Sequence, residues 1–374
     1  MKPDKAIIVS GVNLYKAGSL KVMQDCLLAL SSYVQEEGGR LIALVHKKEL
    51  YEGYPGIEFL EFPQSRKSWL HRLYYEYIHF RKLSLDYKPS LWLSMHDMTP
   101  NVVAPVRAVY CHNTSAFYKS GWREIVCDYR FFLFSLFYNK LYRINIKKNN
   151  YVIVQQQWLR EGFERIFGID NVIVASPEIK QWAAGEEKTE TRRREKKEGY
   201  SFFYPSVPRT YKNFELACRA AQLLQKAGIS DFRVYLTLDG SENKYAKELY
   251  RKYHTVDNIR FVGFLSREEM EYYYSQSDCL LFPSKLESWG LPVMEAKERA
   301  MPVLLADLPY AKETIGAYEQ AAFFNPADAR ELASLMGELI RGEAPFTPTR
   351  SIDYKQPYVN TWHALFDMLL KDIA

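Results

Sequence analysis

The sequence predicts an α/β protein with two domains, each built on a parallel sheet. The chain has 374 residues, enough for two domains of roughly 150 residues each. Apolar runs of strand length alternate with stretches of helical periodicity, and this alternation starts again near residue 200. Residues 183–199 carry many charges of both signs and no apolar periodicity, which is typical of a solvated connector. We therefore expect one domain over 1–182, a second over 200–350, and a C-terminal segment over 351–374.

In the first half, the predicted strand Ala6–Ser10 leads into a loop that contains Gly11 and Gly18. Residues 20–35 follow with apolar side chains at helical spacing. Short apolar runs predict further buried strands at 41–45, 57–60, 91–93, 108–110 and 151–154.

In the second half, strands are expected at 201–205, 232–236, 259–262, 278–282, 302–305 and 321–324. Helices are expected in the gaps between them, and a final helix over about 359–373. In open parallel sheets, ligands sit beyond the carboxyl ends of the strands.

Composition and charge exclude several classes of protein. Apolar residues make up 47% and charged residues 25%, as in folded globular chains. A net charge of +5 is too small for this length to indicate nucleic-acid binding. The five cysteines are scattered without a C-x-x-C pair, so we expect free thiols in a reducing compartment and no zinc site. No apolar run approaches the ~20 residues of a membrane span, and the start of the chain does not resemble a secretory signal. We expect a cytoplasmic protein, with contact to the inner face of the membrane left open.

The most informative stretch is residues 281–296, which read L-F-P-S-K-L-E-S-W-G-L-P-V-M-E-A. A buried strand is expected to end at Phe282, and a helix over about 291–300 has Pro292 in its first turn, where its missing N–H costs nothing. The free N–H groups of such a helix start favour an anion such as a diphosphate, and Gly290 lets the backbone come close to it.

Two carboxylates flank this helix start. Glu287 precedes it and Glu295 lies one turn inside, so both can point into one cleft and accept hydrogen bonds from sugar and ribose hydroxyls. The pattern Glu287-x7-Glu295 in this context resembles the donor site of family 4 glycosyltransferases, which have the GT-B fold: two facing Rossmann-like domains with an interdomain cleft. Three further segments agree with the resemblance: 258–266, 274–278 and 307–313.

The resemblance implies a role for each residue of this donor site. Glu295 would hold the nucleotide ribose, and Glu287 would contact the donor sugar. Lys212 fits the lysine that grips the diphosphate, whereas the usual arginine position is not Arg here and Arg209 is a displaced substitute. The amides of Ser288, Trp289, Gly290 and Leu291 would face the diphosphate. The loop that contains Gly263 and Phe264 would pass the base.

The same resemblance implies that the first half of the chain binds the acceptor and supplies a histidine to the reaction centre. His112 follows a predicted strand and matches the histidine that lines the reaction centre near the donor sugar, although a satisfied structural histidine is the alternative. His96 and Asp97 follow the preceding strand and are weaker candidates for acceptor contact; the alternatives are a satisfied structural histidine for His96 and orientation of either histidine by Asp97. Gly11 and Gly18 occupy the position of the glycine-rich loop near phosphate and acceptor.

Two stretches combine aromatic and basic residues at helical spacing, 66–82 and 129–143. They could rest on an anionic membrane and present a lipid-linked acceptor. The alternative is an amphipathic helix packed on the sheet with its basic residues extended outward.

The resemblance implies a metal-independent, retaining glycosyltransferase without a cofactor. It would move a sugar from a nucleotide diphosphate sugar to a hydroxyl of a saccharide or lipid-linked acceptor, in bacterial surface polysaccharide or glycolipid assembly. The final helix, with Trp362, would cross back onto the first domain. Two alternatives remain open: a non-catalytic binding subunit related to glycosyltransferases, and a nucleotide-sugar epimerase or hydrolase on the same fold.

Overall fold

The computed structural model describes residues 6–15, 17–118, 121–176 and 199–371. The chain separates into two compact units, each an α/β structure with one parallel sheet, as the sequence predicts. The first unit contains Met1–Phe117, Leu136–Trp182 and Tyr354–Ala374, and the second contains Tyr118–Ser135 and Ala183–Asp353. Most of the expected connector, 183–199, lies outside the described residues.

The first unit has an eight-stranded sheet in the order β14-β7-β6-β5-β4-β1-β2-β3, with every neighbouring pair parallel. Its central strands are almost completely buried, as expected for a parallel sheet covered on both faces. The strands are β1 (Ala6–Ser10), β2 (Arg40–Val45), β3 (Ile57–Glu61), β4 (Leu91–Ser94), β5 (Val106–Cys111), β6 (Tyr151–Val154), β7 (Val172–Ala175) and β14 (Tyr358–Val359).

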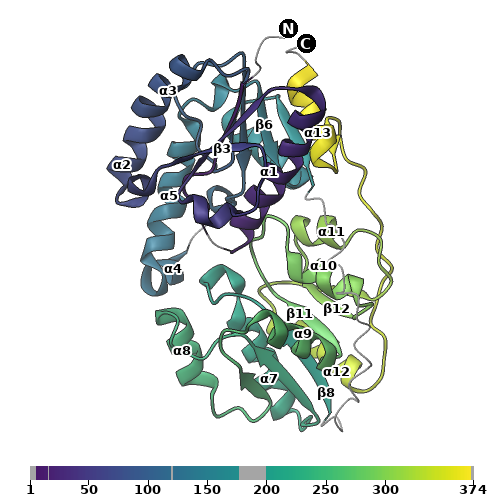
Figure 1. The fold of residues 1–374 in the computed structure, drawn as a ribbon. Helices are drawn as coiled ribbons and strands as arrows, with labels where there is room; N and C mark the ends of the chain where they lie inside the picture. The colour runs from purple at the N-terminus through teal and green to yellow at the C-terminus, as the bar shows by residue number, and fades with distance from the viewer. Residues whose placement is uncertain (1–5, 16, 119–120, 177–198, 372–374) are drawn as a thin grey trace. The chain divides into compact units, whose positions relative to one another are not determined.

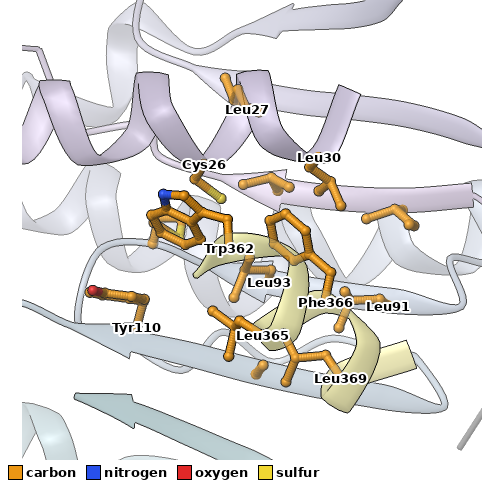
Figure 2. Close-up of a cluster of buried hydrophobic side chains, with 14 of the residues drawn as sticks. Cys26, Leu27, Leu30, Leu91, Leu93, Tyr110, Trp362, Leu365, Phe366 and Leu369 are labelled. Carbon is orange, nitrogen blue, oxygen red and sulfur yellow. The ribbon is translucent and has the colours of Figure 1, made fainter. Parts of the chain in front are cut away.

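The helices of the first unit cover both faces of this sheet. On one face, α1 (Ala17–Glu37) and α13 (Trp362–Leu370) lie side by side (Figure 1). Figure 2 shows Trp362 and Phe366 of α13 beside Cys26 and Leu30 of α1 in one buried apolar cluster. The other helices are α2 (Trp69–Tyr74), the π-helical turn η3 (Tyr75–His79), α3 (Phe80–Tyr87), α6 (Gln157–Phe167) and, from Leu136 onward, α5 (Tyr129–Arg143).

The C-terminal segment belongs to the first unit and is attached to it by a short strand and a helix. β14 adds to β7, with the N–H of Val174 donating to the carbonyl of Pro357 at 3.1 Å. Arg160 of α6 donates to the carbonyls of Lys355 and Gln356 at 2.7 and 2.9 Å. Because Tyr358–Val359 forms a strand, the final helix begins at Trp362 and not near 359 as expected.

The second unit has a six-stranded sheet in the order β10-β9-β8-β11-β12-β13, also parallel throughout. This order places β8 next to β11, so the loops that follow these two strands meet at one edge of the sheet. The strands are β8 (Tyr200–Tyr204), β9 (Phe232–Leu236), β10 (Ile259–Phe261), β11 (Cys279–Phe282), β12 (Val303–Ala306) and β13 (Ala321–Phe324).

Helices connect each strand of the second sheet to the next. They are the 3-10 turn η6 (Thr210–Lys212), α7 (Phe214–Lys226), α8 (Lys244–Tyr253), α9 (Arg267–Gln276), α10 (Leu291–Glu298), α11 (Pro309–Ile315) and α12 (Ala329–Ile340). The unit also takes in residues 118–135, which include α4 (Trp122–Cys127). This differs from the expected domain over 1–182, because residues 118–135 form ion pairs with Arg209 and α7, a ring contact with η6 and a hydrogen bond with α8.

Candidate functional site

The centre of the candidate site is the N-terminus of α10. β11 ends at Phe282, and the loop after it reaches Gly290, whose φ of 89° lies in the left-handed region that an L side chain adopts only with strain. α10 then begins at Leu291 with Pro292 in its first turn. The Thr314 hydroxyl donates to the carbonyl of Trp289 and ties the loop to α11. A fixed helix start of this kind presents backbone N–H groups to an anion.

Glu287 and Lys212 form an ion pair beside this helix start. Lys212 Nζ lies 2.5 Å from Glu287 Oε1, and the two side chains are only 16% and 12% exposed. The pair joins the loop after β8 to the loop after β11, as the neighbouring positions of these strands require. Tyr204 fixes the lysine backbone by donating from its hydroxyl to the Lys212 carbonyl at 2.6 Å. The structure therefore brings together two residues that the sequence separates by 75 positions.

Glu295 lies one turn into α10 and is held by Tyr274 of α9. The Tyr274 hydroxyl donates to Glu295 Oε2 at 2.6 Å. Burial raises the pKa of Glu295, and the hydrogen bond from Tyr274 and the charge of Arg299 oppose this rise. The other carboxylate oxygen can accept hydrogen bonds from the two hydroxyls of a ribose.

The remaining donor-site candidates differ in their surroundings. Gly263 has a φ of 71°, and a Cβ on it would lie 3.3 Å from Asp239 Oδ2, so this turn favours glycine. Phe264 beside it is 86% exposed and free to contact a planar base. Trp289 is 8% exposed, and within the described residues its indole N–H has no hydrogen-bond partner. Ser288 is half-buried and Leu291 is exposed.

Arg209 does not join the Glu287–Lys212 pair. Its Nη1 lies 3.0 Å from Asp128 Oδ2, so the guanidinium is paired with the segment 118–135. Sequence reasoning missed Asp128, because no local pattern indicates that residues from the first half of the chain pack on the second unit.

In the first unit, His112 follows β5 and packs against Tyr110, with ring centroids 4.6 Å apart and ring planes tilted by 32°. Burial lowers the pKa of His112, although the charge of Asp97 opposes this, so the ring is neutral at pH 7. Its Nε2 is buried and has no hydrogen-bond partner in the part of the chain that the structure describes. A neutral imidazole with one uncommitted nitrogen can donate to or accept from a sugar hydroxyl.

Asp97 organises the loop ends around His112. Its carboxylate accepts from the N–H groups of His112 at 2.6 Å and Asn113 at 2.9 Å. It also accepts from the hydroxyls of Tyr138 at 3.1 Å and Tyr142 at 3.0 Å. Both carboxylate oxygens are thus used within the unit, which supports a positioning role for Asp97 and not the expected acceptor contact.

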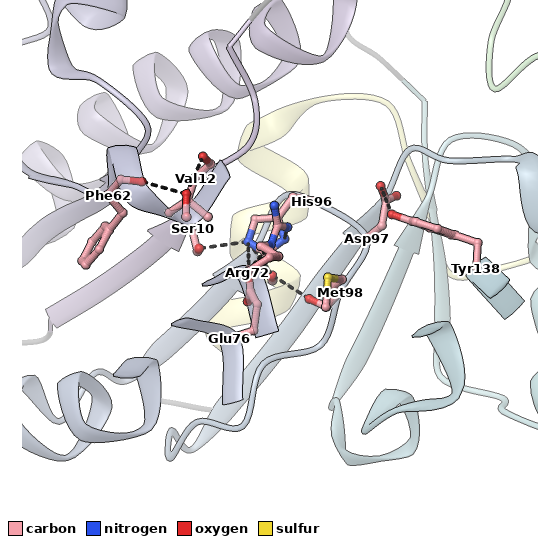
Figure 3. Close-up of polar contacts among 11 residues, drawn as sticks. Ser10, Val12, Phe62, Arg72, Glu76, His96, Asp97, Met98 and Tyr138 are labelled. Atoms are coloured by element: carbon pink, nitrogen blue, oxygen red, sulfur yellow. Dashed lines mark hydrogen bonds and ion pairs between the residues drawn. The ribbon is translucent and has the colours of Figure 1, made fainter. Parts of the chain in front are cut away.

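His96 lies inside a buried polar network (Figure 3). Its Nδ1 is 2.8 Å from Arg72 Nη2, and its Nε2 is 3.0 Å from the Ser10 hydroxyl and 3.4 Å from Glu76 Oε1. Arg72 also donates to Glu76 at 2.8 Å. Burial and the charge of Arg72 lower the pKa of His96 well below 6.5. The ring has no exposed surface, which favours the structural role of His96 over acceptor contact.

The two glycines of the first loop are not equivalent. A Cβ on Gly11 would lie 2.8 Å from the end of the Met23 side chain, so Gly11 lets the loop pack closely on α1. Gly18 lies in α1, and a Cβ there would meet nothing within 4 Å. Neither observation links these glycines to a phosphate.

The two aromatic and basic stretches form helices with a buried and an exposed side. In the first, Arg72, Glu76 and Phe80 face inward, whereas Leu70 and Ile78 are exposed. In the second, Tyr138 and Tyr142 are buried, and the exposed set is Tyr129, Leu133, Leu136 and Phe137. Over the described residues, none of the helices combines the length and the apolar character that crossing a membrane requires.

Comparison with known proteins connects this architecture to a family. Residues 186–354 match the family model described as glycosyl transferases group 1. The chain is 21% identical over 209 residues to the O-antigen chain mannosyltransferase RfbU of Salmonella typhimurium (strain LT2), a match that covers 54% of each chain. The chain thus spans about half the length of this curated relative.

Solved structures show the fold. The glycosyltransferase WaaG, described as involved in lipopolysaccharide biosynthesis, superposes with a TM-score of 0.64 at 12% identity over 91% of each chain. Anabaena HepE in complex with UDP-glucose superposes with a TM-score of 0.59 at 14% identity over 90% of each chain. Residues 186–354 therefore resemble the glycosyl transferases group 1 family, and the two parallel sheets of the chain are those of the GT-B fold.

Proposed function

We propose that the chain is a retaining glycosyltransferase that moves a sugar from a nucleotide diphosphate sugar to an acceptor hydroxyl. The observation that carries this proposal is the arrangement at the N-terminus of α10, where Glu287 is paired with Lys212 and Glu295 is held by Tyr274. Two relatives support it: RfbU is named an O-antigen chain mannosyltransferase, and HepE was solved with UDP-glucose. The acceptor is accordingly proposed to be a growing bacterial surface polysaccharide or glycolipid.

Each of these candidate donor-site residues then has a chemical role in the second unit. The diphosphate lies at the start of α10, where the helix dipole and the backbone N–H groups favour negative charge. Lys212 exchanges the Glu287 carboxylate for a phosphate oxygen and stabilises the charge that develops on the leaving diphosphate. Glu287, released from the lysine, accepts hydrogen bonds from the donor sugar, and Glu295 accepts them from the ribose.

The stereochemical and metal-independent parts of the proposal follow the family resemblance. Retention predicts that the product keeps the anomeric configuration of the donor, which NMR of the product measures. Metal independence predicts unchanged turnover in excess EDTA. His112 is proposed to line the reaction centre, and its uncommitted Nε2 and lowered pKa suit a neutral hydrogen-bonding group.

Contact with an anionic membrane surface is proposed through the first of the two aromatic and basic stretches. Trp69, Leu70, Tyr74 and Ile78 are exposed along α2 and η3, and basic residues such as Arg81 and Lys82 are exposed on the next turn. An exposed apolar edge flanked by positive charge suits a negatively charged lipid surface. Co-sedimentation with vesicles containing anionic phospholipid tests this, and equal recovery with purely zwitterionic vesicles would remove the electrostatic part.

The transferase activity itself is tested with the full chain and a panel of nucleotide sugars. UDP-glucose, UDP-galactose and GDP-mannose are each incubated with saccharide and polyprenyl-linked acceptors, and products are identified by mass spectrometry. We expect one donor to yield a glycosylated acceptor and Glu295→Gln to reduce that yield at least tenfold. Glu298→Gln, on the exposed end of the same helix, is the matched control.

Three outcomes would contradict the proposal. Release of free sugar only would indicate a hydrolase, conversion of the donor sugar to its epimer would indicate an epimerase, and binding of a nucleotide sugar without turnover would indicate a binding subunit.

A further inference from the structure

Residues 118–135 dock on the second unit through charged and polar contacts. Arg123 of α4 forms an ion pair with Glu215 of α7, which is buried. Lys244 Nζ of α8 donates to the carbonyl of Val126 at 3.0 Å. The segment is therefore held at several points that do not involve the candidate donor site.

One further contact of this segment does involve the candidate donor site. Asp128 Oδ2 lies 3.0 Å from Arg209 Nη1. The other carboxylate oxygen accepts from the N–H of Phe131 at 3.2 Å, so Asp128 also caps the first turn of α5. The Asp128 side chain is 12% exposed and the Arg209 side chain 47% exposed. The carboxylate is thus fixed in place, whereas the guanidinium is free to turn away from it.

Arg209 and Lys212 lie at the two ends of the same short turn. Arg209 immediately precedes η6, Lys212 is its last residue, and the N–H of Lys212 donates to the Arg209 carbonyl at 2.9 Å. Phe131 packs against Tyr211 between them, with ring centroids 4.8 Å apart and ring planes tilted by 37°. Both cations of this turn are therefore neutralised by carboxylates, Arg209 by Asp128 and Lys212 by Glu287.

We propose that Asp128 competes with the donor diphosphate for Arg209 and so sets the affinity of the donor site. This inference rests on the proposed function and adds to it a residue from the first half of the chain. When the diphosphate binds at the start of α10, Arg209 turns from Asp128 to a phosphate oxygen, because a diphosphate offers more charge and the two-oxygen geometry that a guanidinium prefers. Asp128 keeps its hydrogen bond to the Phe131 N–H, and α4 stays docked through Arg123.

The substitution Asp128→Asn isolates this competition. Asparagine retains the side-chain oxygen that accepts from the Phe131 N–H but loses the charge that holds Arg209. Titration calorimetry of the full chain with inorganic diphosphate and with UDP is expected to show binding roughly two- to fivefold tighter, the range for losing a partly exposed ion pair. Asp257→Asn, an exposed position in the same unit, makes the same change in net charge and is expected to leave the affinity unchanged.

A double-substitution cycle separates the competition from other effects. In an Arg209→Met background, Asp128→Asn is expected to change nothing, because the guanidinium for which the ligand competes is gone. Unchanged or weaker diphosphate binding by Asp128→Asn alone overturns the inference. Lys212→Met serves as the test of the underlying site. If it fails to weaken UDP binding, the proposed function itself fails, whereas if it weakens binding and Asp128→Asn has no effect, only the competition is refuted.

Discussion

Replacing Arg72 by methionine is expected to give the first unit a new dependence of stability on pH. Arg72 is the cation of the buried network in Figure 3, where it donates to Glu76 at 2.8 Å and to His96 at 2.8 Å. Glu76 is fully buried, and burial raises its pKa to about 7 even though Arg72 opposes the rise. Without Arg72, the pKa of Glu76 rises further and the folded protein keeps a proton in this network to higher pH.

The size of this pH dependence follows from the number of protons that the folded and unfolded states bind. Above pH 7 the unfolded chain carries no proton on Glu76 or His96, whose ordinary pKa values are 4.5 and 6.5. The wild-type network also loses its proton near pH 7, so its contribution to the free energy of unfolding is constant above about pH 8. In Arg72→Met the folded state still holds one proton, so the free energy of unfolding falls by about 1.4 kcal/mol per pH unit. At pH 8 the total loss is expected to be about 3–5 kcal/mol, the usual cost of breaking a buried ion pair.

Urea unfolding of both proteins at pH 7, 8 and 9 measures this difference. The comparison is made above pH 7 because at lower pH the unfolded chain takes up a proton on His96 that the folded protein does not, which opposes the effect of Glu76. Arg81→Met, on the exposed side of α3, is the control and is expected to cost less than about 0.5 kcal/mol at every pH. A stability difference between Arg72→Met and wild type that stays constant from pH 7 to 9 would refute the reasoning.

Three further substitutions, with Gly228→Ala as a control for one of them, test the core and the candidate donor site. Trp362→Ala removes a buried aromatic side chain that joins α13 to the first unit and is expected to lower the stability of that unit by about 3–5 kcal/mol in urea unfolding. Gly290→Ala imposes left-handed strain of about 1–2 kcal/mol at the start of α10 and should weaken UDP binding. Gly228→Ala, with a φ of +81° and no atom within 4 Å of the new Cβ, is expected to show similar strain with unchanged UDP binding. Tyr274→Phe removes the hydroxyl that lowers the pKa of Glu295, so the carboxylate protonates at higher pH and UDP affinity should fall more at pH 6 than at pH 8.

Local sequence patterns were sufficient for most of the fold. The apolar runs at Ala6–Ser10, Tyr151–Val154 and Phe232–Leu236 are strands with the expected bounds, because a buried parallel strand needs a short continuous apolar run. The strand Val172–Ala175 is also a short continuous apolar run and could have been predicted from it. The two-residue strand at 358–359 is too short to show such a run, and it depends on tertiary contacts: pairing with β7 and burial of Val359 in the core.

Residue spacing alone predicted the candidate site only where its residues lie close together in sequence, and Lys212 was expected there from the family resemblance. Glu287 precedes α10 and Glu295 lies one turn inside it, so the relative placement of the two carboxylates follows from helical spacing. The pairing of Arg209 with Asp128 spans 81 positions and depends on residues 118–135 packing on the second unit. Arg72 and Glu76 have the i, i+4 spacing of a helical ion pair, but their complete burial with His96 depends on tertiary packing.

The central claim is that the start of α10, Lys212 and Glu295 together bind a nucleotide diphosphate sugar. A crystal structure of the full chain with the nucleoside diphosphate that binds most tightly tests it directly. We predict a diphosphate within hydrogen-bonding distance of the first N–H groups of α10 and of Lys212 Nζ, with the ribose hydroxyls on the Glu295 carboxylate. A nucleotide bound elsewhere on the chain, with the Glu287–Lys212 pair intact, would contradict the account.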